Sequence, residues 1–239
     1  MKTFADNECW GIKIEIAKEL SSNGAFLAQS CIKVKNRDKD KEYLRLWENL
    51  VKQLAKEISE KHTIEKLKNN RVARAYRNFF WRHEIDPTKT RPAGEALARR
   101  ILRKKQIPSI NPIVDAGNLA SALTLISIGL YDVKKIPSKN LVLKYSEGGE
   151  KFNPIGGKTV ILEKGIPVLK SSDTIMHIYP HRDSKETMID AETEEVLALA
   201  AGVNGIEHDE CLRALEYTIT FMNRLGLNPI VLMPPKIIL

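Results

Sequence analysis

The hydrophobic and polar positions of this chain follow two periods, one helical and one extended. Residues 12–16 alternate apolar and charged side chains and residues 26–34 are mostly apolar, which predicts two strands with a turn at Ser21–Gly24 between them. Apolar residues then recur at helical spacing, which predicts helices over 43–58, 64–81 and 92–103. Prolines mark two of the boundaries, because Asp86-Pro87 disfavours a continuing helix and Pro92 suits a first helical position.

The second half of the chain combines one more helix pair with short β-rich runs. Asn111 is a good N-cap and Pro112 a good first residue for a helix that is predicted to reach Ile126. A closing helix is predicted over 208–225. The candidate strands lie at 141–145, 159–162, 167–169, 175–179 and 196–200. With no internal repeat or linker, the pattern favours one α+β unit.

Composition excludes several classes of protein. A hydrophobic content of 43% and a charged content of 28% are ordinary for a soluble globular chain. No stretch approaches the ~20 consecutive apolar residues of a membrane span, and the first ten residues lack the apolar segment of a secretory signal. Cys9, Cys31 and Cys211 are few and far apart, which predicts three reduced core thiols in a cytoplasmic protein without membrane partners.

The positive charge is concentrated in the first half of the chain. Residues 1–105 hold 25 Lys and Arg against 14 Asp and Glu, whereas residues 106–239 hold 13 against 16. Between Lys61 and Lys105 there are 14 cations and only 4 acids. This asymmetry favours a polyanionic partner such as RNA, and a solvated helix surface is the alternative interpretation.

Two short motifs fail their tests. The string IGGKT has Phe152 where a phosphate-binding loop needs glycine. His181-Arg182-Asp183 matches a kinase catalytic loop, but the glycine-rich loop and the downstream metal-binding motif of kinases are missing. The five histidines show no metal-ligand spacing, so neither a metal nor another cofactor is implied.

Candidate chemistry lies on the helix from Pro112 and after the strand at 175–179. Asp115 and Asn118 share a helical stripe that is otherwise apolar, so they either bond neighbouring groups to fix the helix or hold a ligand. Arg182 can bind a phosphate and Asp183 can orient a water, with a solvated turn as the alternative for both.

Three stretches together resemble a known family. DPTKTRPAGEALARRIL, INPIVDAGNLASALTLISIGLYD and HIYPHRDSKETMI are similar to stand-alone members of a tRNA-editing domain family, which is defined by the B-three/B-four editing domain of the phenylalanyl-tRNA synthetase β subunit. The resemblance covers residues 72–205. It implies an α+β fold in which a central β-structure encloses a pocket and is flanked by helices. Since the resemblance leaves out the start of the chain, we expect a single domain over 1–239 on which residues 1–70 pack as an N-terminal extension.

The resemblance also implies an activity and a partner. Family members act in translation quality control on aminoacylated tRNA and hydrolyse the ester between a wrong amino acid and the terminal ribose, without a cofactor. On this basis we expect Asn118 and Asp183 to be catalytic. The expected substrate-binding residues are Asp115, Ser121, Gly129, Tyr131, His181 and Arg182. The expected RNA-binding residues are Arg91, Arg99, Arg100, Arg103, Lys104 and Lys105.

This sequence departs from the family at two pocket positions. The bacterial synthetase domain has a histidine where a gapless comparison puts Gly129, and a glutamate that would fall near Ala198. The selectivity of the synthetase for tyrosine is therefore not carried over to this chain. The departures keep open a non-catalytic module that binds an amino acid or tRNA, and a small-molecule hydrolase that ignores RNA is a third possibility.

Overall fold

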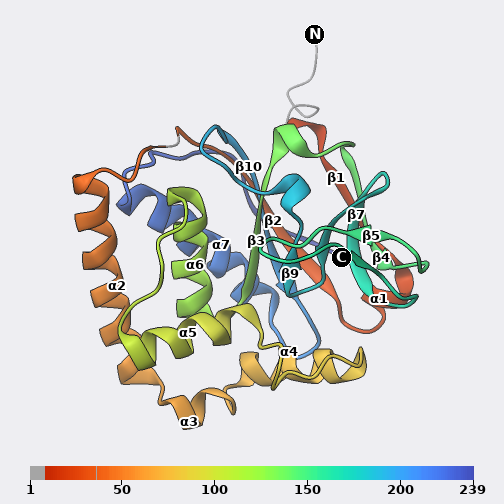
Figure 1. The fold of residues 1–239 in the computed structure, drawn as a ribbon, viewed down its shortest axis with the longest axis horizontal. Coiled ribbons are helices and arrows are strands. Elements are labelled where there is room, and N and C mark those ends of the chain that lie inside the picture. Colours follow the sequence, from red (N-terminus) through yellow and green to blue (C-terminus); the bar gives the residue numbers. More distant parts are fainter. Residues whose placement is uncertain (1–8, 36) are drawn as a thin grey trace.

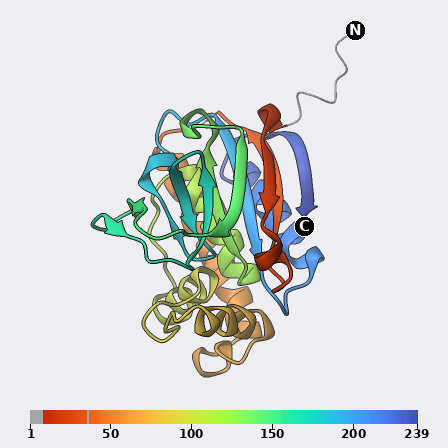
Figure 2. The ribbon, with the colours of Figure 1, turned by 90° about the vertical axis from the view of Figure 1, so that its right-hand side faces the viewer.

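Two β-sheets lie face to face, and a layer of helices covers the outer side of one of them (Figure 1 and Figure 2). The computed structural model describes residues 9–35 and 37–239. The expected α+β class with flanking helices is thus confirmed. The expectation about a secretory signal falls mostly on residues 1–8, which lie outside the described residues.

Sheet A has the strand order β1-β4-β7-β8-β9. Strands β1 and β4 run parallel, and every other neighbouring pair of this sheet is antiparallel. Its strands are β1 (Lys13–Ile16), β4 (Asn140–Tyr145), β7 (Pro167–Ser171), β8 (Thr174–Ile178) and β9 (Arg182–Asp183). Strands β5 (Lys151–Phe152) and β6 (Val160–Ile161) form a separate two-stranded antiparallel sheet.

Sheet B is antiparallel throughout, with the strand order β11-β2-β10-β3. Its strands are β2 (Phe26–Lys33), β3 (Ser127–Asp132), β10 (Glu195–Gly202) and β11 (Ile230–Ile238). The sequence pattern did not predict β3 or β11. The strands predicted over 12–16 and 26–34 do form, but they belong to different sheets, and the short helix α1 (Lys18–Ser21) precedes the turn between them.

β2 is an interior strand, with seven of its eight residues buried. An almost uninterrupted apolar run is typical of a strand that is covered on both faces. The segment 1–70, which the sequence sets apart as an extension, therefore contributes the strand between β10 and β11.

The helices form mainly where helical periodicity predicts them. They are α2 (Lys41–Lys61), α3 (Ile64–Leu67), α4 (Arg71–Arg82), α5 (Ala93–Lys104), α6 (Pro112–Thr124) and α7 (His208–Arg224). The prediction of one helix over 64–81 is wrong, because the side chain of Asn70 accepts hydrogen bonds from the amides of Val72 and Ala73 and so caps a new helix. The Asn111 side chain caps α6 as predicted, accepting from the amide of Ile113.

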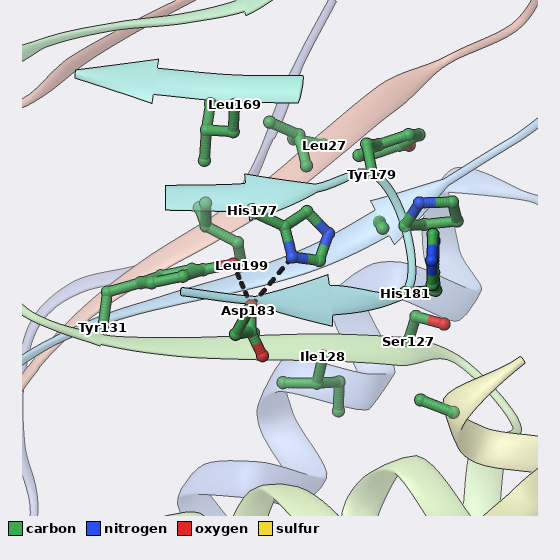
Figure 3. A pocket seen from close by; sticks show the side chains of 14 residues that line it. Leu27, Ser127, Ile128, Tyr131, Leu169, His177, Tyr179, His181, Asp183 and Leu199 are labelled. Atoms are coloured by element: carbon green, nitrogen blue, oxygen red, sulfur yellow. Dashed lines mark hydrogen bonds and ion pairs between the residues drawn. The ribbon is translucent and has the colours of Figure 1, made fainter. Parts of the chain in front are cut away.

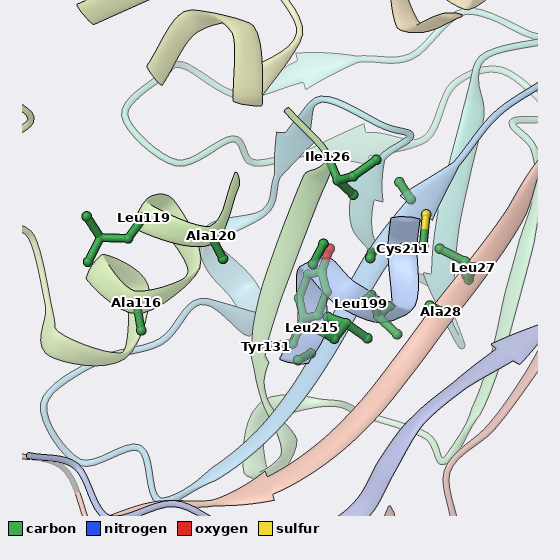
Figure 4. Packing of buried hydrophobic residues seen from close by; sticks show 14 of the residues in the cluster. Leu27, Ala28, Ala116, Leu119, Ala120, Ile126, Tyr131, Leu199, Cys211 and Leu215 are labelled. Atoms are coloured by element: carbon green, nitrogen blue, oxygen red, sulfur yellow. The ribbon is translucent and has the colours of Figure 1, made fainter. Parts of the chain in front are cut away.

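The core continues through sheet B into both neighbouring layers (Figure 4). Leu27 and Leu199 extend toward sheet A, whereas their neighbours Ala28 and Ala200 face the opposite way, since side chains alternate along a strand. Cys211 and Leu215 of α7 are fully buried against sheet B. Small alanines on this face allow the helix to approach the strands closely.

The cysteine prediction is wrong for two of the three residues. Cys9 and Cys31 form a disulfide with a Cα–Cα distance of 5.1 Å, while Cys211 is free and buried. Sequence spacing gave no sign of the pair, because the contact exists only once β2 has folded beside the turn that holds Cys9. Burial raises the pKa of the Cys211 thiol to about 12, so this thiol is protonated and unreactive at neutral pH. Among the described residues, no helix is long and apolar enough to cross a membrane.

Candidate functional site

A small chamber lies between the two sheets, with a volume of about 30 Å³, which is room for a water-sized guest (Figure 3). Strands of both sheets build it, because β2, β3 and β10 supply one wall and β7 and β8 the other. The lining residues with polar side chains are Ser127, Tyr131, His177, Tyr179, His181 and Asp183.

Asp183 is the shared acceptor of the chamber. Its Oδ1 accepts a hydrogen bond of 2.8 Å from the hydroxyl of Tyr131, and the Nδ1 of His177 lies 2.8 Å from the same oxygen. His177 is the cross-strand partner of Asp183 in the β8–β9 pair, whereas Tyr131 comes from β3 of the other sheet. Among the described residues, no hydrogen bond to Oδ2 of Asp183 is present. One carboxylate oxygen is therefore fixed and the other is available to a guest.

Tyr131 acts as a permanent donor to this carboxylate. Burial, reinforced by the negative charge of Asp183 and its hydrogen bond, raises the pKa of Tyr131 well above the ordinary value for tyrosine. The hydroxyl thus keeps its proton across the physiological range, and the Asp183 side chain stays in one orientation.

Two buried polar atoms of the chamber have no hydrogen-bond partner within the described part of the chain. They are Oγ of Ser127 and Nδ1 of His181. Buried polar atoms without a protein partner commonly bind an ordered water or a ligand. Both residues line the same small chamber, so the chamber contains two buried polar groups without a protein partner.

His181 is neutral in the folded protein at physiological pH. Burial lowers its pKa to about 4, and the nearby His177 and Arg182 act in the same direction. The unfolded chain binds this proton near pH 6.5, so the unfolded state gains protons first on acidification. We expect the free energy of unfolding to fall as the pH is lowered from 6.5 to about 4.

Denaturant unfolding at several pH values checks this expectation. His181→Gln removes the titrating group, so the variant is expected to lose less stability than the wild type over the same pH interval. Equal pH dependence in the two proteins would contradict the assignment.

An open groove of about 360 Å³ adjoins the chamber. Ile128, His181 and Asp183 line both spaces, so the two meet at the free side of the carboxylate. The remaining groove residues are Ile110, Val114, Gly117, Asn118, Leu130, Ile155, Arg182, Met188 and Ile189. An apolar concavity with a few convergent polar groups is the usual form of a small-molecule site.

Two glycines shape these spaces. A Cβ on Gly129 would lie 2.2 Å from the hydroxyl oxygen of Tyr131, so no other residue fits there without moving the tyrosine. A Cβ on Gly117 would lie 2.8 Å from Cδ1 of Leu130, so glycine allows α6 to approach β3 closely beneath the groove.

The comparison with known families decides the identity of this fold. Residues 75–225 match the family model described as the B3/4 domain. The chain belongs to the B3/4 domain family. This match covers most of the segment that resembles the synthetase editing domain in sequence, and it extends through α7.

A solved structure supports the fold of this B3/4 protein. The crystal structure of an N-terminal fragment of the phenylalanyl-tRNA synthetase β subunit from Pyrococcus horikoshii superposes with a TM-score of 0.51 at 13% sequence identity. The alignment covers 95% of this chain and 50% of that fragment, so the chain spans about half its length. At this identity the likeness shows the fold alone. No curated protein matches this sequence.

Six of the expected site residues line the two spaces of the B3/4 protein. Gly129, Tyr131, His181 and Asp183 line the chamber, and Asn118 and Arg182 line the groove with His181 and Asp183. The sequence comparison placed a family glutamate near Ala198, and this alanine is fully buried on β10.

Two expected site residues lie away from both spaces. The carboxylate of Asp115 is fully buried and accepts hydrogen bonds from the hydroxyls of Tyr43 and Ser109 and from the amide of Ile110. Ser121 donates to the backbone oxygen of Ile126. Of the two roles that the sequence left open for Asp115, its contacts match the structural one.

The expected RNA-binding cations divide into two groups. Arg99 bonds the buried Glu95 and Lys105 donates to Ser59. The other four are exposed and form no ion pair among the described residues, namely Arg91, Arg100, Arg103 and Lys104. They lie along α5 and just before it, and Ala93 at the start of this helix lines the chamber.

Sequence reasoning missed His177 and Ser127. The signal for His177 was available, because a histidine in a predicted strand and an acid just beyond a Pro-containing turn become neighbours when the chain reverses. Ser127 gave no signal, since β3 was not predicted.

Proposed function

We propose that this B3/4 protein binds aminoacylated tRNA and hydrolyses the ester of a mischarged amino acid in trans. One observation carries the proposal: Asp183, with one oxygen fixed by Tyr131 and His177, lies where a water-sized chamber meets a groove of ligand size. A water and an ester can therefore reach the same carboxylate from two sides.

In the proposed reaction the water occupies the chamber, and the ester carbonyl lies at the end of the groove beside Asp183. The water oxygen attacks the carbonyl carbon while Oδ2 of Asp183 accepts a water proton. The tetrahedral intermediate then collapses, the bond between the carbonyl carbon and the ribose oxygen breaks, and the ribose oxygen takes the proton back from Asp183. The products are the free amino acid and tRNA with its terminal hydroxyl restored.

Groove residues supply positioning in this scheme. The side-chain amide of Asn118 can donate to the carbonyl oxygen as negative charge develops there. Arg182 carries a positive charge suited to the terminal phosphate of the tRNA. Neutral His181 and Ser127 orient the water, and His177 holds Asp183 in place.

The exposed cations of α5 are proposed to bind the tRNA backbone. Arg100→Glu with Arg103→Glu is expected to weaken tRNA binding by about tenfold or more and to flatten its dependence on salt, because phosphate contacts release counterions. Filter binding or fluorescence anisotropy across a salt series measures both quantities.

A charge-matched control is available on other faces of the chain. Arg213 and Lys18 are exposed, and Arg213→Glu with Lys18→Glu changes the net charge by the same amount. Equal loss of affinity in the two double variants would show that net charge, and not the α5 surface, governs binding.

A panel of mischarged tRNAs tests the proposed reaction. Purified protein is incubated with each tRNA, and loss of the ester is followed over time against buffer. Acceleration for at least one pair is expected. Tight tRNA binding without acceleration for any pair would favour the non-catalytic module, and ester hydrolysis insensitive to salt and to tRNA would favour a small-molecule hydrolase.

A further inference from the structure

We infer that the groove selects an aliphatic amino-acid side chain, such as that of valine, isoleucine, leucine or methionine. The inference rests on the proposed function for the chemistry beside Asp183, and it concerns which aminoacyl group is accepted. Four features of the described residues carry it.

The chamber excludes the amino-acid side chain. Its volume of about 30 Å³ matches a water and is far below that of an aromatic ring. Tyr131 fills the space above Gly129, and its hydroxyl is held by Asp183, so the chamber does not widen without breaking that hydrogen bond. The side chain of the guest therefore lies in the groove.

The groove is lined mainly by aliphatic side chains. They come from the loop before α6, from α6, from β3 and from the segments after β5 and η3 (Lys185–Thr187), namely Ile110, Val114, Ile128, Leu130, Ile155, Met188 and Ile189. Among the described residues, no phenylalanine, tyrosine or tryptophan lines it. Its polar side chains in the described part of the chain are those of Asn118, His181, Arg182 and Asp183, all of which the proposed chemistry uses.

Several of these apolar residues are exposed in the absence of a guest. Ile110 is 60% exposed, Ile155 50% and Met188 38%. Clustered exposed apolar side chains beside a reactive group mark a ligand surface, since covering them removes apolar area from water. Aliphatic side chains on the guest give this gain without placing a polar group where it lacks a partner.

The groove is tight where α6 faces β3. A Cβ on Gly117 would lie 2.8 Å from Cδ1 of Leu130, so any larger residue there would displace that side chain. A flexible aliphatic chain adapts to such a space, whereas a planar phenol needs a flat slot and a partner for its hydroxyl. The groove therefore favours leucine or isoleucine over tyrosine, and over serine, whose small polar side chain covers little of the aliphatic lining.

Binding of stable aminoacyl analogues tests the inference independently of catalysis. 3′-Aminoacylamino-3′-deoxyadenosines carrying leucine, tyrosine or serine have an amide in place of the ester, and their affinities are measured by calorimetry. The leucyl compound is expected to bind about tenfold or more tightly than the other two, since a few apolar contacts discriminate at this level. Tightest binding of the tyrosyl or seryl compound, or equal binding of all three, would overturn the inference.

A groove variant with a matched control separates the side-chain contact from general effects. Ile155→Asp is expected to weaken leucyl-analogue binding by about tenfold. Ile161→Asp alters an isoleucine that is 59% exposed on β6 and lines neither space, and it is expected to leave binding unchanged. If both variants bind the leucyl analogue equally weakly, or if neither loses affinity, Ile155 does not contact the amino-acid side chain.

The mischarged-tRNA panel then distinguishes the two proposals. Hydrolysis that is fastest for an aliphatic aminoacyl ester supports both. Hydrolysis that is fastest for tyrosyl or seryl esters overturns the inference and leaves the proposed function standing. Absence of hydrolysis overturns the proposed function, and the analogue affinities still decide which side chain the groove accepts.

Discussion

Replacing Asp183 by asparagine is expected to lower the rate of ester hydrolysis by about a thousandfold, within the range for loss of a positioned general base. Asparagine keeps the size of the side chain and an oxygen that can accept from Tyr131, but it cannot take a proton from water. Because an asparagine oxygen can still accept the hydrogen bonds that Tyr131 and His177 make at 2.8 Å, the fold is expected to survive the change. Single-turnover deacylation of the best tRNA of the panel measures the effect.

The control for this experiment is Asp173→Asn, at the exposed turn between β7 and β8. It is expected to retain the wild-type rate. The melting temperature and the affinity for the leucyl analogue should stay close to the wild-type values in both variants. A D183N protein that is folded, binds the analogue and hydrolyses the ester at the wild-type rate would exclude Asp183 as the base.

Replacing Glu95 by alanine is expected to lower the free energy of unfolding by about 3 kcal/mol, because it strips two partly buried cations of their shared partner. The Glu95 carboxylate is fully buried, and its two oxygens accept from Arg77 and Arg99 at 2.7 Å. Burial alone would raise the pKa of Glu95, but the hydrogen bonds and charges of the two arginines outweigh it and lower the pKa. The stabilisation is therefore present above pH 4.5 and is lost as the pH falls below it.

Urea unfolding at neutral pH measures this loss. Glu216→Ala on the exposed side of α7 is the matched control, and it is expected to change stability by less than about 0.5 kcal/mol. The triple change E95L, R77M and R99M is expected to recover much of the stability, since apolar side chains of similar size remove the unpaired charges together. A much smaller loss of unfolding free energy in E95A would show that water reaches both arginines.

The helical part of this fold could largely be predicted from the sequence. Apolar spacing and capping residues predicted α2, α5, α6 and α7 within a few residues, because those signals are local. The break at Asn70 was missed, since the capping interaction outweighs the continuing apolar pattern there. β3 was missed because its run SIGLYD follows α6 with only a short interval and contains a glycine.

The candidate site could be predicted only in part from the sequence, for a related reason. Asp183, Tyr131 and His181 were named from the sequence, and the structure brings them to one chamber. Their arrangement depends on sheet A and sheet B facing each other, which no local pattern encodes. The same holds for the Cys9–Cys31 pair and for the burial of Asp115 against Tyr43, both of which join segments that lie far apart in the chain.

The position of β2 has a consequence for how the protein is made. Cys31 pairs with Leu197 on one side and Met233 on the other, so β2 needs partners that the ribosome synthesises much later. At about 5–20 residues per second, an apolar nascent strand waits for roughly ten to forty seconds before its last partner exists. We therefore expect a chaperone to shield Phe26–Lys33 during translation, and expression yield to depend strongly on chaperone supply.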